Sequence, residues 1–154
     1  MMTNLCCKVL STLSGCTLVT AESCTGGGIG SALTAIPGSS KVYKGGIISY
    51  TNDVKMKQLN VSKEILDREG AVSAPVAEAM AMGVRIALSA DVAVSVTGLA
   101  GPDGDDFGNP VGTVFVGYAD NKKTISCEYH FSGDREAVRK QAMEAALRLI
   151  LEQI

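Results

Sequence analysis

The chain has 154 residues, of which 46% are hydrophobic and 19% charged, and a net charge of -2 at pH 7. These values fit one globular domain over residues 1–154, and the slightly acidic balance gives no basic footprint for nucleic acid. No apolar run is long enough to span a membrane, and the N-terminal segment predicts a helix and not a secretory signal. We therefore expect a cytoplasmic protein that binds neither nucleic acid nor membrane.

The predicted elements of the first half alternate between helices and strands. In chain order they are a helix over 2–14, a strand over 17–21, a helix over 29–36, a strand over 46–50, a short helix capped by Asn52 and running through 55–59, and another capped by Ser62 and ending at Gly70. A glycine-rich turn separates the first strand from the second helix.

The second half begins with a long helix that Ala74-Pro75 opens and that extends to about residue 88. It is followed by a strand over 91–97, a glycine loop over 98–104, a hairpin of strands 111–118 and 124–131, and a C-terminal helix that starts at 133–134 and runs to about 151. The order α-β-α-β-α-α-α-β-β-β-α predicts an α/β fold, namely a three-layer α/β/α sandwich with a mixed, mostly parallel sheet.

Sheet edges and the methionines around Met80 and Met82 offer a subunit interface, so we expect a homo-oligomer, although core packing is the simpler account of the methionines. The five cysteines are an odd number without a C-x-x-C pair, which indicates neither a disulfide framework nor a zinc site and fits a reducing compartment. The single histidine, His130, lies in a predicted strand and is the only residue available for a Ser-His-Asp triad. We expect no metal and no cofactor.

Ser23 lies in the turn Ala21–Gly27, between a predicted buried strand and a helix. Free amides at a helix N-terminus favour an oxyanion or a phosphate, so Ser23 is a candidate nucleophile with the amides of residues 25–27 as its oxyanion donors. One alternative is that Ser23 only caps the helix. Another is that Cys24 is the nucleophile, because a helix N-terminus lowers a thiol pKa.

A lysine is the natural base for Ser23 because no spare histidine exists. Lys55 follows Tyr50 at the end of a predicted strand, and its neutral form requires burial that lowers its pKa. The alternative is a solvated lysine on a polar helix face, where Lys57 would point elsewhere.

Two further segments are candidates for substrate contact. The loop Thr97–Pro102 ends a buried strand, and its glycines allow a ligand to approach the backbone, although it is alternatively a plain strand exit. Arg135 and Arg139 share a helix face and suit phosphate or carboxylate, although a surface salt-bridge ladder is the alternative.

Several motifs together resemble one family, the CinA C-terminal domain family of nicotinamide-nucleotide amidohydrolases. They are Ala21–Gly27, Pro37–Ser40, Tyr50-Thr51-Asn52 with Lys55, Gly70–Ser73, Thr97–Gly104 and Pro110–Thr113, and the similarity extends from about residue 5 to 151. The resemblance implies hydrolysis of the amide of nicotinamide mononucleotide, in pyridine nucleotide salvage, by the stand-alone form of the domain.

The resemblance also implies roles for individual residues. Ser23 matches the family's proposed nucleophile, Lys55 its partner lysine and Tyr50 the aromatic residue beside them. The residues expected to contact the nucleotide substrate are Glu22, Cys24, Thr25, Gly26, Gly27, Thr97, Gly98, Ala100, Gly101, Arg135 and Arg139. The other hypotheses are a nucleotide-binding or competence-related regulatory module without turnover, and an amidase for another small amide.

Overall fold

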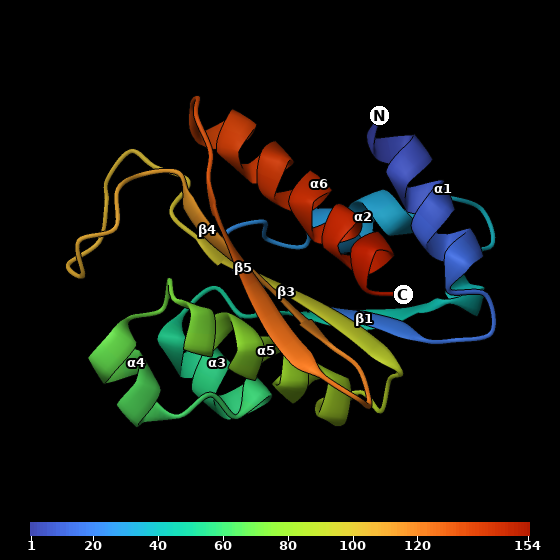
Figure 1. The fold of residues 1–154 in the computed structure, drawn as a ribbon, viewed down its shortest axis with the longest axis horizontal. Coiled ribbons are helices and arrows are strands. Elements are labelled where there is room, and N and C mark those ends of the chain that lie inside the picture. Colours follow the sequence, from blue (N-terminus) through green and yellow to red (C-terminus); the bar gives the residue numbers. More distant parts are fainter.

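A computed structural model describes all 154 residues of the chain. The elements follow one another in the predicted order (Figure 1). Their bounds are α1 (Met2–Thr12), β1 (Leu18–Glu22), α2 (Gly28–Thr34), a 3-10 turn (Ser39–Lys41), β2 (Tyr43–Ile48), α3 (Asn52–Leu59), α4 (Lys63–Glu69), α5 (Ala74–Ala87), β3 (Val92–Gly98), β4 (Thr113–Ala119), β5 (Thr124–His130) and α6 (Arg135–Gln153). None of these helices has the length and apolar character needed to cross a membrane.

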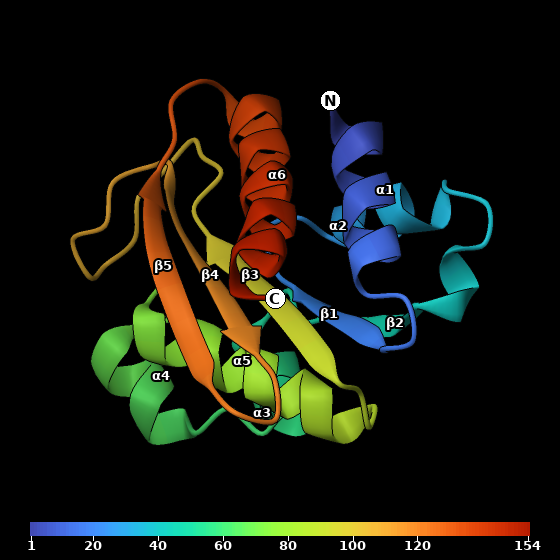
Figure 2. The same ribbon diagram turned by 45° about the vertical axis from the view of Figure 1, so that its right-hand side comes forward.

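The five strands form one mixed sheet in the order β2-β1-β3-β4-β5. β1 pairs in parallel with both β2 and β3, whereas β3–β4 and β4–β5 are antiparallel, so four of the five strands run in the same direction. Helices α1, α2 and α6 cover one face and α3, α4 and α5 cover the other (Figures 1 and 2). The predicted three-layer α/β/α fold is confirmed.

Alternating side chains along the strands build two cores, one on each face of the sheet. Leu18 of β1 packs in a cluster of 23 buried residues beneath α1, α2 and α6, whereas Val19 and Ala21 pack in a cluster of 12 against α5. This alternation continues past the end of the strand, since successive side chains of an extended segment point to opposite faces. Glu22 therefore lies on the α2 face, and Ser23 on the α3 face.

Helix boundaries differ from the predictions in small ways that have local causes. Thr51, and not Asn52, caps α3, because its hydroxyl accepts a hydrogen bond from the Val54 amide at 3.4 Å. The predicted cap of α4 is confirmed, with the Ile65 amide donating to Ser62 Oγ at 3.1 Å. β2 ends at Ile48, so Tyr50 lies in the loop after the strand. Met80 is fully buried in the core, as expected.

Candidate active site

A cavity of about 300 Å³ lies where β1, β2 and β3 end. Because these three strands are parallel, their carboxyl ends meet at one edge of the sheet, which is where sites gather in α/β folds. Nine of the residues singled out from the sequence line it, namely Ser23, Cys24, Tyr50, Lys55, Thr97, Gly98, Ala100, Gly101 and Arg135. Segments up to 112 residues apart in the chain therefore contribute to one site.

Lys55 is the only cationic side chain with almost no solvent exposure. Its side chain is 1% exposed, and its Nζ donates to Ser23 Oγ at 3.1 Å and to the Ser49 carbonyl oxygen at 2.8 Å. No carboxylate pairs with it, so burial lowers its pKa from 10.5 to about 8. The alternative of a solvated lysine is wrong for Lys55, whereas Lys57 is exposed and pairs with Asp53.

The turn that carries Ser23 is held by backbone contacts and not by a serine cap. The Ser23 amide donates to the Val96 carbonyl oxygen at 3.0 Å, which extends the pairing of β1 with β3 by one residue. α2 begins only at Gly28, after Gly27 with a φ of 96°, so the alternative that Ser23 caps this helix is wrong.

The amides of the turn divide into used and free donors. The Gly26 amide donates to the Ser23 carbonyl oxygen at 3.1 Å. The amides of Cys24 and Thr25 donate to no backbone or side-chain acceptor of the protein. Of the donors expected for an oxyanion, the Gly26 amide is therefore already committed, whereas the amides of Thr25 and Gly27 are free, as is that of Cys24.

Cys24 lines the cavity next to Ser23 but differs from it chemically. The side chain is 6% exposed, and burial raises the pKa of the thiol to about 11. The expectation that the helix N-terminus lowers this pKa is wrong, because desolvation outweighs the nearby positive charges. At neutral pH this thiol stays protonated and is a poor nucleophile.

Five residues expected to contact substrate lie outside the cavity lining, namely Glu22, Thr25, Gly26, Gly27 and Arg139. The Arg139 guanidinium donates from Nε to the Cys24 carbonyl oxygen at 3.0 Å and from one terminal nitrogen to that of Thr25 at 3.2 Å. Arg135, one turn earlier, donates to the Gly101 carbonyl oxygen at 2.6 Å and to Tyr50 Oη at 3.0 Å. Neither arginine forms an ion pair, so the alternative of a surface salt-bridge ladder is wrong.

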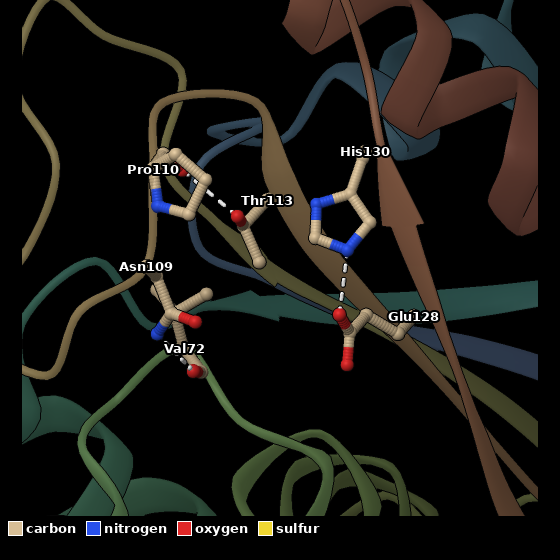
Figure 3. A network of polar contacts seen from close by, with 6 residues as sticks. All are labelled: Val72, Asn109, Pro110, Thr113, Glu128 and His130. Atoms are coloured by element: carbon tan, nitrogen blue, oxygen red, sulfur yellow. Dashed lines mark hydrogen bonds and ion pairs between the residues drawn. The ribbon is translucent and has the colours of Figure 1, made fainter.

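The remaining cavity walls are formed by Leu99, from the loop already offered as a candidate for substrate contact, and by residues that the sequence reasoning did not single out as site residues. These are Asn52, Ala71, Val72 and Asp103. Thr97 Oγ1 donates to the Ala71 carbonyl oxygen at 2.8 Å, and Asn109 Nδ2 donates to that of Val72 at 3.1 Å (Figure 3). Ala71 and Val72 belong to the motif Gly70–Ser73, which the family resemblance included. Neither residue has a polar side chain that would have marked it as part of a site.

The single histidine belongs to neither the cavity nor the Ser23 contacts. His130 Nε2 pairs with Glu128 Oε2 at 2.6 Å on β5, and both side chains are more than half exposed (Figure 3). A Ser-His-Asp triad is therefore absent, and Ser23 has Lys55 as its side-chain partner. The chain also contains no group of three or more His, Cys, Asp or Glu side chains placed to hold a metal ion.

The chain is similar to known proteins over nearly its whole length. The sequence profile described as the CinA C-terminal domain matches residues 3–154. The chain belongs to this family. A Pseudomonas putida protein named nicotinamide-nucleotide amidohydrolase PncC is 47% identical over 135 residues, which cover 88% of this chain and 84% of that protein. A CinA-like protein of Thermosynechococcus vestitus is 50% identical over 141 residues, or 90% of this chain.

Solved structures of CinA superfamily proteins share the whole fold. The competence-damaged protein (CinA) superfamily protein of Escherichia coli superposes with a TM-score of 0.97 at 38% identity, covering 100% of this chain and 91% of that one. The competence/damage inducible protein CihA of Agrobacterium tumefaciens gives a TM-score of 0.94 at 36% identity, covering 98% and 94%. Among the curated relatives, the chain spans 84% of the P. putida protein but only 34% of the T. vestitus one.

Proposed function

We propose that this CinA-family domain hydrolyses the carboxamide of nicotinamide mononucleotide to nicotinate mononucleotide and ammonia, as an enzyme of pyridine nucleotide salvage. One observation carries the proposal: Ser23 Oγ and Lys55 Nζ lie 3.1 Å apart in a cavity, and burial lowers the pKa of Lys55 to about 8. The similarity to the P. putida protein named for amidohydrolase activity on nicotinamide nucleotides supports this choice of substrate.

In the proposed reaction, neutral Lys55 takes the proton of Ser23 Oγ, which attacks the carboxamide carbon. The negative charge on the substrate oxygen is met by the free amide of Cys24, which lines the cavity next to Ser23. Lys55 then passes its proton to the departing nitrogen, and ammonia leaves an acyl group on Ser23. Water hydrolyses this ester with Lys55 again as the base, which restores the serine and releases the carboxylate.

The cavity offers one side-chain cation for the substrate phosphate. Arg135 lines the wall and lies between Gly101 and Tyr50, whereas Arg139 is committed to the Cys24 and Thr25 carbonyl oxygens. We therefore assign the phosphate to Arg135 and the adjoining loop of residues 98–101, because a planar guanidinium suits phosphate oxygens. Tyr50, held by Arg135, lies at the cavity mouth with 60% of its surface exposed, where its ring is available to the substrate.

The test is ammonia release from a panel of related amides. Nicotinamide mononucleotide, nicotinamide riboside, nicotinamide and the dinucleotide are compared for the wild-type protein and for Ser23→Ala. We expect the mononucleotide to be the preferred substrate, and Ser23→Ala to lose turnover while keeping its fold. Cys24→Ala serves as the matched control, since the proposal requires it to lose far less activity than Ser23→Ala.

Three results would overturn the proposal or change its substrate. Turnover of Ser23→Ala near the wild-type rate would remove the serine from the chemistry. Calorimetric binding of the mononucleotide with no ammonia produced would favour a regulatory binding module, and a different preferred amide would change the substrate.

A further inference from the structure

The backbone amides in the first turn of α2, which the sequence suggested as donors to a substrate anion, are already bound by the Glu22 carboxylate. Glu22 is the last residue of β1 and is 2% exposed. Its carboxylate accepts hydrogen bonds from the amides of Ile29 at 2.9 Å and Gly30 at 3.0 Å, in the first turn of α2. The free donors of a helix N-terminus are the groups that attract anions, so Glu22 already satisfies those of α2.

The same carboxylate also holds the turn that follows it. Thr25 Oγ1 donates to Glu22 Oε1 at 2.6 Å, and the Thr20 hydroxyl lies 3.4 Å from Oε2. Glu22 forms no ion pair, so hydroxyl and amide donors alone surround it. Its position two residues before the free amide of Cys24 makes it an anchor between β1, the turn and α2.

Arg139 restrains the opposite side of the turn. Its guanidinium binds the carbonyl oxygens of Cys24 and Thr25. In a planar trans peptide the carbonyl and the following N–H point in opposite directions. A Cys24 carbonyl directed at Arg139 therefore turns the Thr25 amide away from α6, and leaves it without an acceptor inside the protein.

We infer that Glu22 is a positioning residue, which acts with Arg139 to fix the turn of residues 23–27 so that Ser23 Oγ and the Cys24 amide are held in a reactive arrangement. This role builds on the proposed function but assigns Glu22 no contact with substrate. Glu22 acts through Thr25 Oγ1 and the first turn of α2, and it lies on the face of the sheet opposite to Lys55.

Glu22→Gln tests the inference because it keeps the size of the side chain but replaces one acceptor oxygen with a donor that faces other donors. We expect kcat to fall about 10²-fold, as a misplaced reacting group does, with KM little changed. The rise of activity with pH should stay centred near 8, because Lys55 is untouched. A folded Glu22→Gln protein with wild-type kcat, or one with raised KM alone, would overturn the inference.

Thr25→Val removes the hydroxyl that donates to Glu22 Oε1. This variant is a second test for the case in which Glu22→Gln does not fold. It should lower kcat, and the double variant should lose much less than the product of the two single losses, because both variants weaken the same set of contacts around the Glu22 side chain. Additive losses would contradict a shared role. Ser62→Ala, which removes the cap of α4, is the stability control and should keep wild-type kcat while lowering the midpoint of unfolding.

Labelling of Ser23 by phenylmethylsulfonyl fluoride separates this inference from the choice of substrate. In that reaction Ser23 Oγ bonds to sulfur, fluoride leaves, and Lys55 accepts the serine proton. The labelling rate therefore measures how well the turn positions Ser23, and no carboxamide substrate is needed. If the wild-type protein is labelled and Glu22→Gln is labelled much more slowly, the positioning role holds even when the mononucleotide is not hydrolysed. Equal labelling rates, or a wild-type Ser23 that is inert to the reagent, would overturn it.

Discussion

Glu22 and Lys55 are two buried charged side chains on opposite faces of the sheet, on either side of Ser23. Glu22 accepts hydrogen bonds from a hydroxyl and two helix amides, whereas Lys55 has only the Ser23 hydroxyl and one carbonyl oxygen as partners. A buried charge that is well supplied with hydrogen-bond partners stabilises local structure, whereas desolvation of a charge with few partners shifts its pKa towards the neutral form. The comparison separates the residue that we propose to hold the site from the one that we propose to act as its base.

Replacing Lys55, the proposed base, should have the largest effect on kcat. Lys55→Met keeps an unbranched side chain of similar length but has no base, so we expect kcat to fall about 10³-fold or more. Lys57→Met is the matched control on the same helix, because Lys57 is exposed and pairs only with Asp53. Steady-state ammonia release measures both, and similar losses in the two variants would contradict the base role.

The pH dependence should report the lowered pKa of Lys55 directly. The neutral amine is the active form, so kcat/KM should rise about tenfold per pH unit below a pKa of about 8 and level off above it. Between pH 6 and 8 this amounts to a rise of about 50-fold, measured with the mononucleotide at subsaturating concentration. A profile that is flat over this range would remove Lys55 from the rate-limiting proton transfer.

Stability should change in opposite directions at the two buried charges. The folded state lowers the pKa of Lys55 from 10.5 to about 8, which costs about 3 kcal/mol below pH 8 and nothing above pH 10.5. Lys55→Met removes this cost but also removes two hydrogen bonds worth about 1 kcal/mol each. The difference should raise the free energy of unfolding at pH 7 by about 1 kcal/mol.

This gain should fade as the pH rises from 8 towards 10.5, because wild-type Lys55 then loses its buried charge. Glu22→Gln should instead lower the free energy of unfolding, since its carboxylate has its hydrogen-bond donors in place. Urea unfolding at pH 7 and pH 10 measures both variants. A Lys55→Met protein less stable than the wild type at pH 7 would show that burying the lysine costs little.

A smaller effect is expected at Arg135, a partly satisfied cation on the cavity wall. Arg135→Lys keeps the charge but loses the planar fork, so KM for the mononucleotide should rise about tenfold. The riboside, which lacks the phosphate, is the control substrate and should show little change in KM. Equal changes for the two substrates would place Arg135 at another part of the nucleotide.

Much of the fold and part of the site followed from the sequence by itself. The element order, the two faces of the sheet and the Ser23 turn depend on local periodicity and on glycine positions, which are properties of short segments. The single histidine excluded the usual base without any structure. The resemblance to the CinA family then paired Ser23 with Lys55, and the structure places them in contact.

Only the tertiary structure decided how charged groups near Ser23 behave. The pKa values of Lys55 and Cys24 depend on desolvation by segments far away in the chain, and no local pattern records how deeply a side chain is buried. The same is true of Glu22 and Arg139, whose partners are chosen by how α2 and α6 pack. Sequence located Ser23 as the candidate nucleophile, but packing determined the burial and the partners of the charged groups around it.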